Sequence, residues 1–313
     1  PNQMNSYRET RWDEPSFVLN SDFSHPTRGI GIYHNSTYRL GRFTFAGALR
    51  LEIERPSLDY HSYVRTSYTA YRRDDPLLDP ETTVVDLDES GVLSHTYVEL
   101  LPKVSVMYGL QGNVAGNVYA SFSKGYKPGG FNTQMFSEVL QQRLMHIMGI
   151  GKQYDVNSVV GYKPEYSWNY EIGTHLSFAE GKVQAEMSLF YIDCRDQQLT
   201  MFPEGTTTGR IMTNAGKTRS AGGEISVKYI PVDGLLLNAA YGYTDARFRE
   251  FNNGLHDYRG KVIPYVPRNT LFLQSVFTCS PRTGVIEHWT FDVNMKGTGK
   301  IYWNEDNTRW QDF

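Results

Sequence analysis

The sequence predicts an all-β fold, a transmembrane antiparallel β-barrel. Apolar and polar residues alternate through long segments of the chain, which is the period of a strand with two different faces. These segments are joined alternately by short turns and by long polar stretches, which is the plan of a membrane barrel. Aromatic residues make up 14% of the 313 residues, and the aromatic girdles of such a barrel require a high content.

The alternation is clearest between Tyr166 and Tyr191. Aromatic or aliphatic residues stand at nearly every second position of Tyr166–Phe178 and of Val183–Tyr191, and the tight turn Ala179-Glu180-Gly181 joins the two segments. The same alternation recurs in Phe43–Ile53, Val104–Leu110, Ile225–Tyr229, Leu235–Tyr243 and Trp289–Met295. A strand of about 13 residues spans roughly 43 Å, which exceeds an ordinary soluble strand and suits a tilted membrane strand.

The connections predict two different ends of the barrel. We expect short turns at Leu40–Arg42, Gln111–Asn117, Ala179–Gly181, Pro231–Gly234 and Ser280–Gly284. We expect long extracellular loops at Glu54–Thr96, Lys124–Lys163, Gln197–Thr218 and Arg247–Arg268. Within the second loop, Ser137–Met148 has helical spacing and predicts a short surface helix with Ser137 as its N-cap.

Composition and motifs argue against several other classes of protein. The net charge of −3 gives no broad electrostatic case for nucleic acid binding. The sequence contains no run of about 18 apolar residues, so we expect no membrane-spanning helix. Cys194 and Cys279 have no metal or redox spacing, and the scattered histidines form no ligand set. Gly297-Thr298-Gly299-Lys300 lacks the remaining residues of a phosphate loop. We therefore predict no catalytic residue, no metal site and no cofactor.

Charged residues on the polar strand faces are candidates for contacts inside the barrel. They are Arg42, Arg50, Glu52, Glu171, Glu186, Glu224 and Asp292. Two interpretations remain open: a water-filled lumen solvates these side chains, or they contact a plug folded inside the barrel.

Residues near the expected extracellular ends are candidates for ligand binding. They are Tyr126, Phe131, Arg195, Phe202, Arg210 and Tyr265. These side chains either pack within the girdle and the loops or bind an anionic or aromatic ligand.

Five segments, in order along the chain, resemble one family. YASFSKGYKPGGFN at Tyr119–Asn132 and PEYSWNYEIG at Pro164–Gly173 are similar to recurring strands of TonB-dependent outer-membrane receptors. Asn214–Glu224, Tyr241–Ala246 and Val266–Thr270 resemble three further segments of that family. The resemblance covers roughly residues 101–303, and the first hundred residues share mainly the patterning.

The resemblance implies a 22-stranded barrel in the outer membrane of a Gram-negative bacterium, surrounded by lipid. It also implies an N-terminal plug, an N-terminal segment that binds the TonB complex, and active uptake of a scarce nutrient, most often a ferric siderophore. This chain shows no plug and only about a dozen strands, so we expect residues 1–313 to be a partial barrel within a longer receptor. Its open edges would make the isolated chain aggregate.

Other functions remain open from the sequence. A receptor of the same family could take heme, cobalamin or an oligosaccharide, and a passive porin-like barrel would need no plug. A soluble secreted β-protein would need shorter strands than these.

Overall fold

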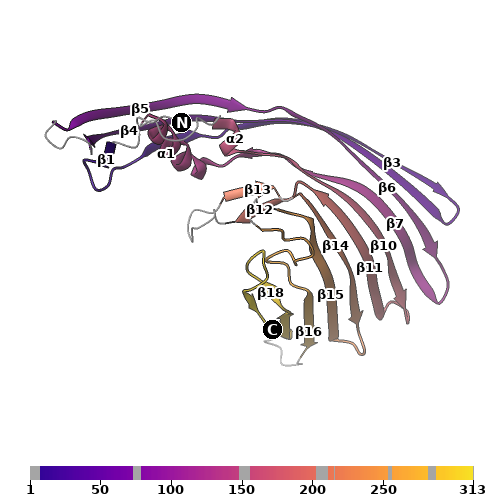
Figure 1. Cartoon of the computed structure of the whole chain (residues 1–313). Helices are drawn as coiled ribbons and strands as arrows, with labels where there is room; N and C mark the ends of the chain where they lie inside the picture. The colour runs from indigo at the N-terminus through magenta and orange to yellow at the C-terminus, as the bar shows by residue number, and fades with distance from the viewer. Residues whose placement is uncertain are drawn as a thin grey trace.

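A single curved antiparallel sheet dominates the computed structural model, which describes residues 8–72, 79–147, 156–201, 211–214, 216–252, 256–280 and 287–312. Thirteen strands form this sheet: β1 (Arg8–Trp12), β2 (Asn20–Ser24), β3 (Thr27–Leu40), β4 (Phe43–Arg72), β5 (Glu81–Ser94), β6 (Tyr97–Leu110), β7 (Val114–Lys127), β10 (Glu165–Phe178), β11 (Val183–Arg195), β14 (Lys217–Tyr229), β15 (Leu235–Glu250), β16 (Asn269–Cys279) and β17 (Trp289–Thr298). In Figure 1 they follow one another around an arc, so the sheet is the wall of a barrel that is not closed.

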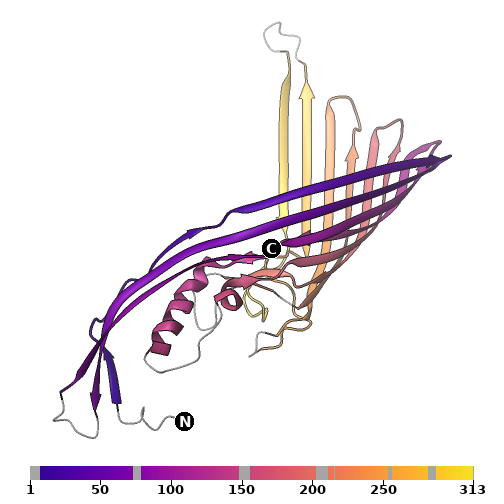
Figure 2. The same cartoon turned by 90° about the horizontal axis from the view of Figure 1, so that it is seen from above.

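The strands at the N-terminal side are much longer than the sequence predicts. β4 has 30 residues. Its first half pairs with β6 and its second half pairs with β5, which follow each other along the same edge of β4. The expected loop Glu54–Thr96 is therefore wrong, because most of it is a hairpin. Figure 2 shows this hairpin projecting past the other strands. The polar outward residues of Asp59–Tyr71 gave the segment the composition of a loop although its backbone pairs throughout.

The short connections lie together at the other end of the sheet. Gly41 and Arg42 join β3 to β4, and residues 179–182 join β10 to β11, where Ala179, Glu180 and Gly181 all have positive φ. This is the backbone of a tight hairpin turn. The turn expected at Gln111–Asn117 is shorter than predicted, because β7 already begins at Val114. The turn Pro231–Gly234 is confirmed, and Ser280–Gly284 lies mostly outside the described residues.

The long connections carry small elements at the opposite end. These are β8 (Gly130–Phe131), the 3-10 turn η2 (Thr133–Met135), α1 (Phe136–Ile147), α2 (Val156–Val160), β9 (Gly161–Tyr162), β12 (Gln198–Met201), β13 (Ile211–Asn214), β18 (Ile301–Tyr302) and β19 (Trp310–Gln311). The expected loop bounds shift inward, because β7 and β15 continue to Lys127 and Glu250. In the described part of the chain, no helix is long and apolar enough to cross a membrane.

The predicted helix is present as α1, but Ser137 does not cap it. The helix begins one residue earlier, directly after η2, and the Ser137 hydroxyl donates to the Gln134 carbonyl oxygen at 3.1 Å. Leu140 and Leu144 of α1 are buried against Val64 and the facing strand β5. The helix thus covers the inner face of the projecting hairpin.

The two faces of the sheet differ in chemistry. On β4 the outward residues between Phe43 and Ile53 are apolar or glycine, and on β11 the outward residues run from Val183 to Tyr191 without a charge. Many of them are solvent-exposed in the isolated sheet, including Leu189 at 65% and Leu49 at 45%. An exposed apolar band of this extent is the face that a barrel presents to lipid.

Candidate functional site

Three glutamates line one hollow on the inner face of the sheet. Ser188 of β11 pairs with Glu224 of β14, and His175 of β10 pairs with Glu186 of β11. Because directly opposed residues and residues two apart on a strand share a face, this register puts Glu171, Glu186 and Glu224 on one side. All three line one hollow of about 610 Å³.

The hollow is rich in carboxylates and poor in cations. Among the described residues that line it, Lys296 on β17 is the single lysine or arginine. The Tyr119 hydroxyl donates to Glu171 Oε1 at 2.6 Å, which fixes that carboxylate. Glu186 and Glu224 are exposed in the lumen and form no ion pair within the described part of the chain. The site therefore presents unneutralised negative charge to whatever occupies the lumen.

The other predicted lumen residues are placed differently. Arg50 and Glu52 form an ion pair with each other on the inner face of β4. Asp292 of β17 also faces inward, where both its oxygens accept hydrogen bonds from the Gln274 side chain. Arg42 lies in the short turn before β4, at the rim of the sheet. None of these four residues lines the hollow beside Glu171.

The predicted ligand-binding residues do not form one site. Tyr126 packs beside Tyr166, with ring centroids 5.8 Å apart, and its hydroxyl is buried without a hydrogen-bond partner among the described residues. Tyr265 lies in the loop before β16 with a φ of 63°, and its ring contacts the ring of Trp303 after β18. Tyr126 and Tyr265 therefore contact different residues and do not belong to one binding site.

Two further candidates do not line the glutamate-lined hollow. Phe131 is only 5% exposed and packs in the cluster of Leu58, Tyr60 and Phe136, so it stabilises the loop layer instead of meeting a ligand. Arg195 is exposed on the outer face of β11, because it occupies the same alternating positions as the outward residues Met187 and Leu189. Phe202 and Arg210 lie outside the described residues.

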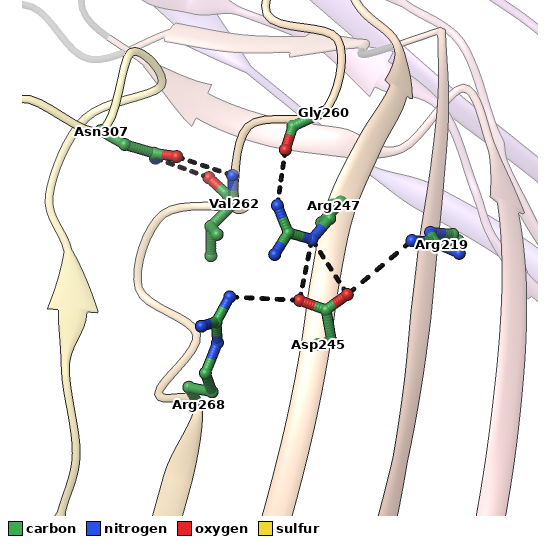
Figure 3. Close-up of polar contacts among 7 residues, drawn as sticks. All are labelled: Arg219, Asp245, Arg247, Gly260, Val262, Arg268 and Asn307. Atoms are coloured by element: carbon green, nitrogen blue, oxygen red, sulfur yellow. Dashed lines mark hydrogen bonds and ion pairs between the residues drawn. The ribbon is translucent and has the colours of Figure 1, made fainter.

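An ion-pair cluster that sequence reasoning missed anchors the loop after β15 (Figure 3). The Asp245 carboxylate lies 2.8 Å from Arg247 Nε, 3.3 Å from an Arg268 nitrogen and 3.8 Å from an Arg219 nitrogen. Arg247 in turn donates to the Gly260 carbonyl oxygen at 2.9 Å. Asp245 lies beyond the tyrosines that end the apolar band, and the arginines lower the pKa of its carboxyl. The alternating charges after Tyr243 were the signal available in the sequence.

A second clamp holds the same loop from the C-terminal side. The Asn307 side chain accepts a hydrogen bond from the Val262 amide at 2.7 Å and donates one to the Val262 carbonyl oxygen at 2.9 Å (Figure 3). Beneath it, Phe248, Phe251, Tyr258 and Ile263 form a buried cluster. The loop is therefore a packed cap over the end of the strands.

Comparison with known proteins identifies the family. The profile described as "TonB dependent receptor-like, beta-barrel" matches residues 2–312. The chain belongs to this family. Its members are receptors and transporters of the Gram-negative outer membrane, and the exposed apolar band on the outer face of the sheet fits the same membrane.

Solved structures of receptors and transporters share the fold. The ferric yersiniabactin uptake receptor FyuA from Yersinia pestis is 19% identical, with a TM-score of 0.50, and the match covers 97% of this chain and 45% of that receptor. The siderophore receptor PiuA from Acinetobacter baumannii is 13% identical over 93% of this chain and 48% of its own, with a TM-score of 0.53. The copper transporter OprC is 13% identical over 90% of this chain and 44% of its own, with a TM-score of 0.50.

This TonB-dependent receptor-like chain spans less than half the length of those solved proteins. At such low sequence identity, the similarity shows that this chain shares their fold. It does not show that this chain shares their cargo.

Proposed function

We propose that residues 1–313 form part of the wall of a longer receptor that actively takes up a ferric siderophore across the outer membrane. Family membership supports the receptor, and the roles of FyuA and PiuA as siderophore receptors support the cargo class. The process is transport and not catalysis. The TonB complex would supply the energy through an N-terminal segment of the receptor, as in the family that the sequence resembles.

The observation that carries the proposal is the glutamate-lined hollow on the inner face. Glu171, Glu186 and Glu224 stand on adjacent strands around one hollow, and like charges gathered in one hollow repel each other unless cations offset them. A plug domain with basic side chains would supply that charge and would also block the lumen at rest. The wall thus fits a gated receptor better than an open pore.

Growth on single iron sources tests the function. A deletion strain complemented with the wild-type receptor should recover growth on at least one ferric siderophore. The Glu186→Gln/Glu224→Gln variant should lower that uptake several-fold, because the plug would no longer be held in one position. Glu180→Gln, the same chemical change in the exposed turn between β10 and β11, is the control and should leave uptake unchanged.

Three outcomes would contradict the proposal. Recovery on no iron chelate would remove the siderophore, and recovery on copper alone would favour the cargo of OprC. Uptake that persists when the TonB complex is absent would indicate a passive, porin-like barrel.

A further inference from the structure

Strand β5 has a free edge along its whole length. All of its residues, from Glu81 to Ser94, pair with β4, and within the described part of the chain no strand pairs with its other side. In Figure 1 it forms the upper margin of the projecting hairpin. An unpaired edge presents a row of backbone N–H and C=O groups to which a further strand can bind.

The register shows which backbone groups of β5 are free. Ser67 of β4 accepts a hydrogen bond from the amide of Asp13, which follows β1 on the other side of β4. The directly opposite residue Val84 therefore exchanges no hydrogen bonds with Ser67, and its own N–H and C=O point away from β4. The same holds for every second residue of β5, which are Thr82, Val84, Asp86, Asp88, Ser90 and Val92.

Closing the barrel does not cover this edge. Further strands would pair with β3 and β17, whereas β5 lies in line with β6, beside the end of β7. The ladder between β6 and β7 stops at Lys103 and Ser123. Pro102, the next residue of β6, has no N–H to continue it, and β7 follows β10 instead as far as Lys127. The edge of β5 thus stays open in a complete barrel.

The free edge lies outside the membrane, with one open face beside it. The apolar outward series of β4 ends at Ile53, and β5 pairs only with β4 residues beyond that position. On the inner face, Val85 and Leu87 are buried in the cluster that includes Leu140 and Leu144 of α1. The side chains of an added strand are therefore selected mainly at the outer face.

That outer face has apolar ends and an acidic centre. Val84 and Val92 are 61% and 68% exposed, and Asp86 and Asp88 lie between them along the strand. The Asp88 carboxylate lies 2.9 Å from His61 Nε2, and its side chain is 67% exposed. Asp86 forms no ion pair among the described residues, and β5 contains no lysine or arginine. Like charges directly opposed destabilise a sheet, so this edge disfavours a second copy of itself and favours a cationic partner.

We infer that β5 binds an extended basic segment of a partner protein, which adds to its free edge as an antiparallel strand. Main-chain hydrogen bonds supply the affinity in this mode of recognition, and alternate side chains supply the specificity. The fitting segment carries basic residues opposite Asp86 and Asp88 and apolar residues opposite Val84 and Val92. The surface shares no residue with the glutamate-lined hollow, so the inference does not depend on the proposed cargo.

A peptide of matching pattern tests the inference. In an antiparallel pair, VTTTKTKTV places its two lysines opposite Asp88 and Asp86 and its two valines opposite Val92 and Val84. The full receptor in lipid nanodiscs should bind this peptide, as measured by the fluorescence anisotropy of a labelled copy. Absence of binding would overturn the inference.

Hydrogen exchange in the complex identifies the edge that binds. The amides of Asp86, Asp88 and Ser90 face the free edge, so they should exchange more slowly when the peptide is bound. The amides of Val85 and Leu87 face β4 and should not change. Peptide binding without this alternation would contradict strand addition.

Two methylated peptides separate strand addition from attraction between charges. In the antiparallel pair the lysine amides bond to β5, and the amides of the threonines directly before them point away. N-methylation of the two lysine amides should abolish binding, whereas N-methylation of those two threonine amides should leave most of it. Equal binding by the two methylated peptides would overturn the inference.

Receptor variants test the acidic centre. Asp86→Asn/Asp88→Asn should lower the affinity for VTTTKTKTV about fivefold, the combined effect of two exposed ion pairs. Glu180→Gln/Asp233→Asn removes two exposed carboxylates from the short turns at the other end of the sheet and should leave the affinity unchanged. Equal affinity of wild type and Asp86→Asn/Asp88→Asn would contradict the inference. Receptor dimers that the peptide disrupts would also contradict it, because they would assign the edge to a second copy.

Discussion

At the scale of single residues, Asp245 has the clearest structural role. One carboxylate faces three arginines, and it holds the loop before β16 through Arg247 and Gly260. We predict that Asp245→Asn weakens the local stability of residues 256–268 by about 1–2 kcal/mol at pH 7. Hydrogen exchange corrected for intrinsic rates measures this, and Asp233→Asn, in the turn at the other end of β15, is the matched control.

The pH dependence of that stability has a definite sign. The pKa of the Asp245 carboxyl is lowered in the folded protein, so its contribution is complete above the unfolded pKa of about 4. The difference between wild type and Asp245→Asn should stay constant from pH 7 to about pH 5. It should shrink as the pH falls through the lowered folded pKa. A difference that grows toward acid pH would contradict the ion-pair assignment.

Sequence reasoning located some of these residues and missed others. Alternation alone put Glu171, Glu186 and Glu224 on one polar face, because the period of a strand fixes the side of every residue. It could not show that Phe131 is buried, since part of the cover comes from Leu58 and Tyr60 of β4, far earlier in the chain. Nor could it show that Asp245 collects three arginines, because the register between strands decides those contacts.

At the scale of elements, helix α1 is held by a few buried leucines. Leu140 is fully buried and Leu144 is 3% exposed against the inner face of the β4–β5 hairpin. We predict that Leu140→Ala costs about 2–5 kcal/mol of local stability and releases the helix. Met145→Ala, at an exposed position of the same helix, should cost far less. Hydrogen exchange over residues 136–147 distinguishes the two, and equal effects would contradict the packing.

Elements with two distinct faces were predictable, and the extended hairpin was not. The strands β10 and β11 and the helix α1 follow from their apolar periods within a few residues, whereas β14 and β15 continue well beyond the predicted Ile225–Tyr229 and Leu235–Tyr243. The hairpin of β4 and β5 leaves the membrane, so its outward residues become polar while its inner face is buried by α1 and the N-terminal strands. Above the membrane, the apolar band that marked the other strands is therefore absent.

At the scale of the whole molecule, the sheet is a lipid-facing wall with two open edges. β3 and β17 each pair on one side only within the described residues, and unpaired backbone groups are not tolerated in lipid. Further strands would have to complete the barrel. The proposed longer receptor supplies them, and the coverage of less than half of each solved relative agrees with this.

The orientation of the two faces is the central claim, because both the lumen and the lipid surface depend on it. Spin labels placed singly along β11 of the receptor in outer-membrane vesicles test it directly, in a background with Cys194 and Cys279 replaced by serine. We predict high oxygen accessibility at Ala185, Met187, Leu189 and Tyr191, low accessibility at Gln184, Glu186 and Ser188, and a fall at Asp193. The opposite phase, or no alternation, would contradict the account.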